Sequence, residues 1–244
     1  MTNAAADEIA KKFGLESVPE SVKRLTEMVS KRGASIEDFA KIVSQDKELS
    51  ERLLRAANPR AARKEDYRAT TVEEALQRAG LSLALLLAMS SPIMRAVLKT
   101  FHTMLAIDLE AKPLRDMPNF EGEHVLGEVT FEGKTSGLVH LRLPASSIAL
   151  LGDRLLGLPP EALADETIAN DVLGELCNMI VGNFKSYLCD AGLNCKLSLP
   201  KISRTKDFKL HSVSGGTSER QGFHARELNF FADLSVNPWV GYWK

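Results

Sequence analysis

Hydrophobic residues recur every three to four positions along the first ninety residues, which is the spacing of amphipathic helices. Helix start signals precede these apolar runs at Pro19, Ser35, Asp46 and Thr71. The last of them opens a Thr-x-x-Glu capping box, and a glycine closes the helix that follows. We therefore expect an all-helical module over residues 1–90.

The rest of the chain, residues 91–244, mixes the helical period with strict alternation of apolar and polar residues. Pro92 is expected to start a helix that runs to about Leu109. The other predicted elements are a hairpin (124–133 and 135–144), helices (145–156 and 165–188), a flexible loop (214–222) and strands (195–199, 208–213 and 226–236). This order predicts an α+β fold, with a mainly antiparallel sheet on one side and two long helices on the other.

The predicted helix from Asp165 to Leu188 has an unusual polar face. At about 100° per residue, five positions fall within about 80° of one another: Asp171, Glu175, Asn178, Gly182 and Lys185. The opposite face is a broad apolar stripe suited to a core: Val172, Leu173, Leu176, Ile180, Phe184, Tyr187 and Leu188. Asn and Gly both weaken a helix, so a merely solvated face would favour other residues. This polar face is the candidate site, and Lys185 is interpreted as its solvated border.

Composition narrows the classes of partner. A formal net charge of −1 argues against bulk electrostatic capture of nucleic acid or of an acidic membrane. The longest apolar run, residues 81–89, is far shorter than the ~20 residues that span a bilayer. The three cysteines have neither disulfide-framework nor zinc-site spacing, and Cys177 is expected to be a buried, reduced thiol. With no N-terminal signal segment, we expect a cytoplasmic protein.

Three segments of the helical module resemble the N-terminal part of an HDOD domain: LESVPESVKRLTEMV (15–29), SIEDFAKIVSQDKELSERLLRAAN (35–58) and TVEEALQRAGL (71–81). The likeness covers roughly residues 8–90, and the further helices of such a domain have no counterpart. HDOD modules are related to metal-dependent phosphohydrolases, but none of the five histidines here is followed by Asp. The resemblance therefore implies a structural or regulatory docking role without metal hydrolysis.

The second part of the chain resembles the CheC/CheX/FliY family of chemotaxis phosphatases, and CheX most closely. The likeness spans about residues 92–238 and is carried by ELCNMIVGN (175–183) followed by LNCKLSLP (193–200). It implies an enzyme that removes the phosphoryl group from an aspartyl phosphate on a response-regulator receiver domain of the CheY type. Pro200 is interpreted as a marker of the fold.

Carried over to this sequence, the resemblance gives Asn178 and Glu175 catalytic roles. Asn178 would enter the partner's active site and orient water, and Glu175 would pair with the receiver's lysine. An amide both donates and accepts hydrogen bonds, which suits holding a water, and a carboxylate suits an ammonium group. Gly182 would leave room for the partner. Asp171 either contacts the partner or caps and solvates the helix.

On this reading the chain binds no cofactor, and the Mg²⁺ of the reaction belongs to the receiver. The helix predicted after Pro92 has no Glu-x-x-Asn motif, so a single site per chain is expected. Pairing of such domains through their sheets leaves a homodimer open. The alternative function is a non-catalytic signalling adaptor, which binds a receiver or another partner through the same helix or the helical module.

Overall fold

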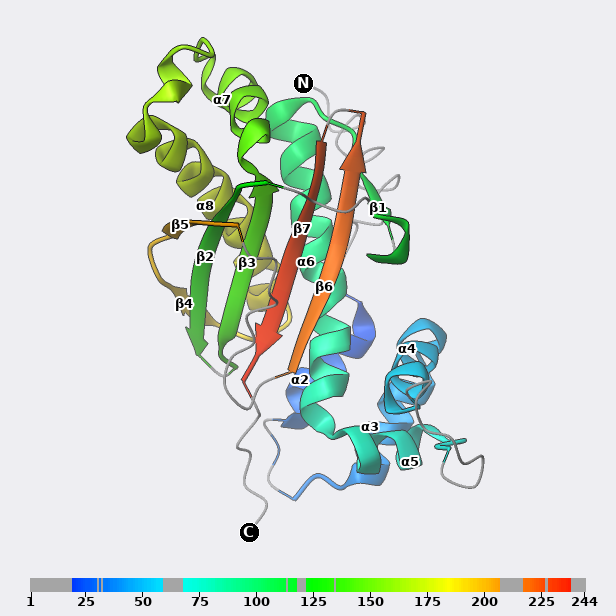
Figure 1. Ribbon diagram of the computed structural model, residues 1–244. Coiled ribbons are helices and arrows are strands. Elements are labelled where there is room, and N and C mark those ends of the chain that lie inside the picture. Colours follow the sequence, from blue (N-terminus) through cyan, green and yellow to red (C-terminus); the bar gives the residue numbers. More distant parts are fainter. Residues whose placement is uncertain are drawn as a thin grey trace, which may run out of the picture.

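The computed structural model describes residues 19–29, 31, 33–58, 68–112, 114–117, 122–133, 135–206, 217–226 and 228–237. Helices make up the N-terminal part, and a sheet backed by long helices makes up the rest (Figure 1). This arrangement confirms the predicted α+β fold, with an antiparallel sheet and two long helices behind it.

In the described part of the helical module, four short helices precede the first long one: α2 (Glu20–Val29), α3 (Ile36–Ser44), α4 (Lys47–Ala57) and α5 (Val72–Ala79). Their start signals act as predicted. Ser35 and Thr71 form capping boxes with the residues three positions later, and the Asp46 carboxylate accepts from the Leu49 backbone N–H at 3.0 Å. Because these caps are local, the sequence alone determined where the helices begin.

Helix α6 (Leu81–Leu105) runs unbroken through Pro92, so the prediction of a helix that starts at Pro92 is wrong. A proline inside a helix removes one backbone donor and normally kinks or breaks it. Here the preceding apolar run continues the helix across the proline, because both of its halves are buried. The helix ends at Leu105 rather than near Leu109, and its C-cap Ala106 has a left-handed φ of 53°.

Within the described residues, α6 is one helix that is long and apolar enough, by length and composition, to cross a membrane. However, 65% of its most apolar stretch is buried inside the protein. Burial of this kind is typical of the central helix of a protein core. The packing within the protein therefore accounts for the apolar character of α6.

Two hydrophobic cores share α6. One core lies among the short helices and includes Ala84, Leu85, Leu87 and Ala88 of α6. The other lies between the sheet and the long helices, and takes Leu86, Met89, Ile93, Ala96, Val97, Leu98, Phe101 and Leu105. Residue 90 thus lies within a helix that belongs to both cores. The division of the chain into 1–90 and 91–244 stays a prediction.

The sheet has the strand order β1-β6-β7-β3-β2-β4, with β5 also paired to β2, and every described pairing is antiparallel. Its strands are β1 (Glu110–Lys112), β2 (His124–Gly133), β3 (Gly137–Pro144), β4 (Cys195–Leu197), β5 (Lys201–Thr205), β6 (Thr217–Ala225) and β7 (Leu228–Val236). The predicted β2–β3 hairpin and the terminal strand are confirmed. The predicted strand at 208–213 lies outside the described residues.

The prediction of a flexible loop over 214–222 is wrong where the structure describes it, because β6 begins at Thr217. The sequence of this strand, TSERQGFHA, lacks the apolar alternation that would have predicted it. Its polar residues are accommodated because they find partners on neighbouring strands. Arg220 binds both carboxylate oxygens of Asp233 on β7, at 2.5 and 2.7 Å. Pairing with β7 and β1, rather than its own sequence pattern, holds β6 in the sheet.

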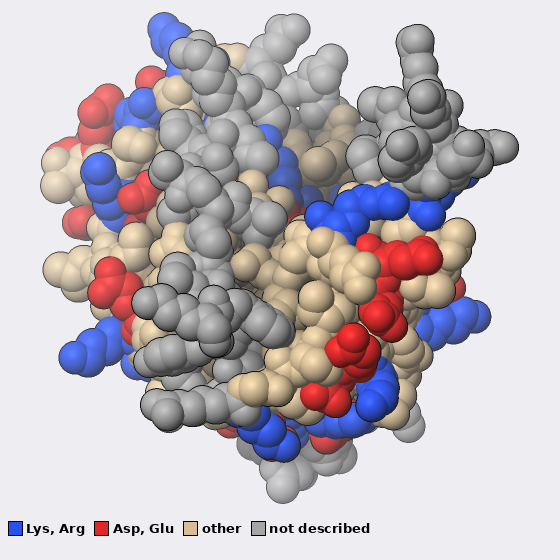
Figure 2. All heavy atoms as spheres, turned by 90° about the horizontal axis from the view of Figure 1, so that it is seen from below, with Lys and Arg blue, Asp and Glu red and all other residues tan. Residues whose placement is uncertain are grey.

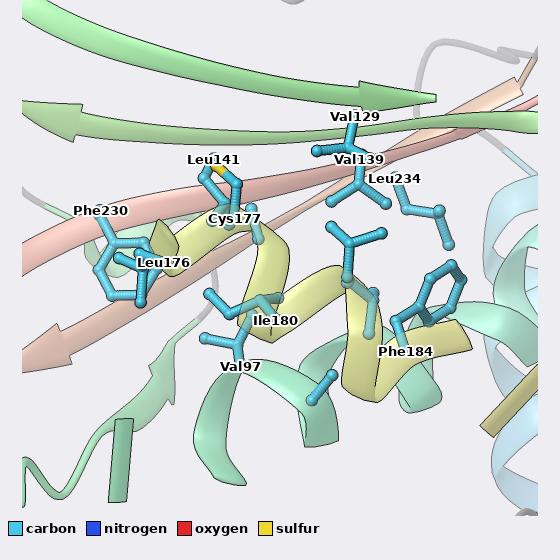
Figure 3. Close-up of a cluster of buried hydrophobic side chains, with 14 of the residues drawn as sticks. Val97, Val129, Val139, Leu141, Leu176, Cys177, Ile180, Phe184, Phe230 and Leu234 are labelled. Carbon is cyan, nitrogen blue, oxygen red and sulfur yellow. The ribbon is translucent and has the colours of Figure 1, made fainter. Parts of the chain in front are cut away.

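Three helices pack with the sheet in the second core: α6, α7 (Ile148–Leu156) and α8 (Glu166–Asp190). Figure 1 shows α6 and α8 lying side by side behind the strands, and Figure 3 shows buried side chains of the strands packed with those of the two helices. Phe184 of α8 meets Phe131 of β2 edge to face, and Phe101 of α6 stacks on Phe230 of β7. Asn183 of α8 also donates to the Thr100 hydroxyl of α6 at 3.0 Å, which joins the two long helices.

Arg52 of α4 links the helical module to the sheet. Its guanidinium donates to the Leu87 carbonyl at 3.0 Å, to the Ser90 hydroxyl and to the Glu219 carboxylate of β6 at 2.6 Å. Leu87 and Ser90 lie just before Pro92 in α6. The Arg52 side chain therefore connects α4, α6 and β6 near the helical turn of α6 that contains Pro92.

Candidate functional site

Helix α8 confirms the predicted long helix, with Asp165 as its N-cap. The Asp165 carboxylate accepts from the Thr167 backbone N–H at 2.8 Å. The predicted apolar stripe is buried along its length except at Tyr187, which is half-buried: Val172, Leu173, Leu176, Ile180, Phe184 and Leu188. Since this stripe faces the sheet, the opposite side of α8 faces away from the core.

The predicted polar face lies on that outward side. Asp171, Glu175 and Asn178 are exposed, while Gly182 and Lys185 are half-buried. Successive members are three or four residues apart, so the side chains of Glu175 and Asn178 are neighbours about one turn apart. Across the described residues, neither of these two side chains has a hydrogen-bond or ion-pair partner in the chain. Both are therefore available to a second molecule.

Gly182 lies one turn after Asn178 on the same face. A Cβ added there would meet no other atom within 4 Å. The fold itself does not require a glycine at this position, because it has an ordinary φ and open space above it. What the missing side chain provides is a flat patch beside the amide.

The helical module contacts α8 at its far end and leaves the polar face open. Ala191, just after α8, is buried in the core of the short helices, and Tyr187 packs against both cores. Glu175 and Asn178, by contrast, stay exposed. The described part of the module thus adjoins the site helix without covering the site.

Cys177 confirms the prediction of a buried, reduced thiol. It is a free cysteine with 1% of its surface exposed, and burial raises the pKa of the thiol to about 12. A Cβ on Gly127 of β2 would overlap its Sγ atom. The sequence reading did not pick out Gly127, although a glycine inside a strand often marks the close approach of another element.

The face of α6 that carries Arg95, Lys99 and His102 offers no second copy of the motif. The His102 ring lies 2.7 Å from the Asp108 carboxylate. This contact near the end of α6 gives His102 a structural role at the surface of the helix. Among the residues described, no group of three or more His, Cys, Asp or Glu side chains is placed to hold a metal ion. The Mg²⁺ expected in the partner stays a prediction.

Charge is mixed on the face of the protein that Figure 2 shows. Seen from below, the described residues place acidic side chains in short rows next to basic ones, without a broad area of one sign (Figure 2). This is the pattern expected for a chain with a formal net charge of −1. On this face, therefore, the described residues create no extended field of one sign.

An antiparallel sheet backed by a helix with an outward acid–amide pair defines the class of site, and comparisons with known proteins agree with it. The family model "Chemotaxis phosphatase CheX" matches residues 125–224, which include α8 and both site residues. The model "HDOD domain" matches residues 15–111. The two resemblances drawn from the sequence are thus confirmed, and the HDOD match extends past residue 90 through α6 to β1. No curated protein matches the chain significantly.

Solved structures show the same fold over 61% of the chain. The chemotaxis protein CheX from Vibrio vulnificus has 20% sequence identity and a TM-score of 0.52, with 61% of this chain and 96% of that chain covered. A CheC-like superfamily protein from Shewanella sp. PV-4 has 22% identity, coverage of 61% and 97%, and a TM-score of 0.52. CheX from Desulfovibrio desulfuricans has 17% identity, coverage of 61% and 99%, and a TM-score of 0.52. At these sequence identities, the likeness shows the fold alone.

Proposed function

We propose that this protein dephosphorylates the aspartyl phosphate of a CheY-like response-regulator receiver domain. The observation that carries the proposal is the position of Glu175 and Asn178. They lie one turn apart on the outward face of a helix whose other face is fixed in the core, and neither has a partner among the residues that the structure describes. The match of this region to the CheX family model supports the same reaction.

In the proposed reaction, water attacks the phosphorus atom and the bond to the aspartyl oxygen breaks, which leaves a free carboxylate and inorganic phosphate. Asn178 holds the water, since its amide oxygen accepts from the water while the amide N–H₂ group donates. An amide is no base at neutral pH, so its contribution is position, which is most of what phosphoryl transfer asks of a protein.

Glu175 has a different proposed role, because it is charged and lies one turn away. Its carboxylate pairs with the lysine of the receiver and fixes the orientation of the two proteins. Gly182 gives the receiver a flat surface to approach, and Asp171 extends the contact by one turn. The metal ion stays with the receiver, where it neutralises the phosphoryl oxygens.

The direct test uses receiver domains from the organism that encodes the chain, each phosphorylated with acetyl phosphate in the presence of Mg²⁺. Release of phosphate is followed with and without this protein. We expect acceleration for at least one receiver, and a loss of about 100-fold in the rate constant for Asn178→Ala, as misplacing a positioned reactant typically costs. Full activity of Asn178→Ala, or no acceleration of any receiver, contradicts the proposal.

Glu175→Gln separates the two proposed roles. It removes the charge while keeping the shape of the side chain, so the receiver concentration at half-maximal rate should rise, and the maximal rate should fall less than in Asn178→Ala. Lys99→Gln on α6 is a matched control, because it changes one charge on a helix outside the site. An unchanged concentration dependence in Glu175→Gln contradicts its pairing with the receiver.

The adaptor function is distinguished by the same assay combined with a binding measurement. Tight binding of a phosphorylated receiver with an unchanged rate of phosphate loss would support an adaptor. The openness of the Glu175–Asn178 face favours the phosphatase, since the described helical module leaves it uncovered. The proposal also places the protein in the cytoplasm with its receiver. A homodimer is part of the same proposal, and light scattering coupled to gel filtration tests it.

A further inference from the structure

Gly127 occupies the middle of β2 on the side that faces α8. Its neighbours on that face of the strand, Val125 and Val129, are buried in the core below the helix. A Cβ built on Gly127 would fall far inside van der Waals contact with the Sγ of Cys177. It would also lie 3.4 Å from Leu173 Cγ and 3.5 Å from Ile202 Cδ1. The helix thus approaches the strand here as closely as a residue without a side chain allows.

This close approach falls on the helical turn that carries the site. Cys177 directly precedes Asn178, and Leu173 lies one turn before Cys177. The Cys177 side chain has one rotatable bond and is 1% exposed, so its neighbours fill the space into which the sulfur would have to turn. An added methyl group at residue 127 would therefore push α8 outward at this turn and move Asn178 with it.

We propose that Gly127 is a positioning residue for Asn178. By bringing no side chain to the interface, it fixes how far α8 stands above β2, and hence how far the amide reaches toward the phosphoryl group of a docked receiver. The effect of this distance on the reaction rate rests on the proposed function. The packing contact on which it depends exists whatever the partner is.

The reach of Asn178 matters because the amide acts by position. A reactant displaced by about 1 Å can lose about 100-fold in rate, whereas docking over a wide surface tolerates such a shift. A change at Gly127 should therefore lower the maximal rate much more than it alters the receiver concentration at half-maximal rate. A merely structural role would instead reduce the fraction of folded protein.

The experiment compares Gly127→Ala, Cys177→Ala and the double variant in full-length protein, with the acetyl-phosphate-treated receiver as substrate. Gly127→Ala should lower the maximal rate at least 10-fold and change half-saturation less than threefold. Cys177→Ala alone should stay within threefold of the unchanged protein. The double variant removes the clashing sulfur and should recover at least half of the lost activity on a logarithmic scale.

Gly222→Ala is the matched control. A Cβ there would also overlap its surroundings, the Met117 side chain, but Gly222 lies on β6, on the sheet face turned away from α8. It should lower the melting temperature without lowering the maximal rate of the folded protein. Equal rate losses in Gly222→Ala and Gly127→Ala would overturn the proposal, as would a Gly127→Ala rate within twofold of the unchanged protein.

A second measurement does not depend on activity. Iodoacetamide labelling with peptide mass spectrometry distinguishes Cys177 from Cys189 and Cys195. The Cys177 thiol should be inert in the unchanged protein and in Gly222→Ala, and should react at least 10-fold faster in Gly127→Ala, where the helix is lifted. If the unchanged protein dephosphorylates no receiver but this labelling difference appears, the proposed function fails and the packing role stands. If Gly127→Ala labels no faster, the packing role fails.

Should Gly127→Ala not fold, Cys177→Val presses a second branch atom against the same backbone from the helix side. It should reproduce the loss of maximal rate. A folded Cys177→Val protein with an unchanged rate contradicts the inference.

Discussion

The two cores of this protein are built in different ways. The core of the short helices is made by segments whose start signals are local, such as the capping boxes at Ser35 and Thr71. The sheet core depends on contacts distant in sequence, such as β3 with β7 and α6 with Asn183 of α8. The proposed site belongs to the second core, because the buried face of α8 packs there. The difference teaches that local start signals can be read from the sequence, whereas the long-range contacts that hold the site helix in place cannot.

A cavity in either core should have the largest effect. Phe184→Ala removes a fully buried ring beneath α8, and Leu53→Ala removes a fully buried side chain of α4. We expect losses in the free energy of unfolding of about 3–5 kcal/mol for the first and about 2–5 kcal/mol for the second. Urea denaturation followed by circular dichroism measures both.

The same two variants show whether the cores are independent. Because α6 contributes to both, each variant should unfold in one transition with a lowered midpoint. Two separate transitions in Leu53→Ala, one of them at the original midpoint, would mean that the shared helix does not couple the cores.

A smaller effect is expected where the cores are joined by a polar link. Arg52 and Glu219 are 20% and 29% exposed and lie 2.6 Å apart. A double-mutant cycle with Arg52→Ala and Glu219→Ala should give a coupling of about 1 kcal/mol, since the pair is partly desolvated. Lys41→Ala with Asp38→Ala is the matched exposed pair within one helix, 3.8 Å apart, and should couple more weakly. A coupling of zero for the Arg52 pair would mean that apolar packing alone joins the two cores.

The smallest expected effect concerns the caps of the short helices at low pH. Hydrogen bonds from the Thr70 backbone N–H and hydroxyl, and then from the Thr71 backbone N–H, hold the pKa of Glu74 below its usual 4.5. A lowered folded-state pKa contributes stability that is complete above the unfolded value, and is lost as the pH falls through the folded value. The melting temperature of Glu74→Gln should therefore be lower than that of the unchanged protein at pH 6, with the difference shrinking below about pH 4.5. A difference that persists unchanged at pH 3 contradicts this.

The sequence predicted the elements whose signals lie within themselves. These include the four short helices, the β2–β3 hairpin and α8 with its polar face. It placed Glu175 and Asn178 together because helical spacing alone determines that they are neighbours. It missed β6, whose polar residues are satisfied by Asp233 on another strand. It also missed the continuation of α6 through Pro92, since burial on both sides of the proline depends on segments far along the chain. Gly127 was missed for the same reason, because its partner is 50 residues away in a different element.

Sharing one helix between two cores limits how the chain can be divided. A cut after residue 90 would sever α6 and separate Leu86 and Met89 from the sheet core to which they belong. It would also uncover Ala191 at the end of the helix that carries the proposed site. Newly exposed apolar surface of this kind favours aggregation. The two parts of the chain therefore cover apolar surface of each other, and each is expected to aggregate when it is produced alone.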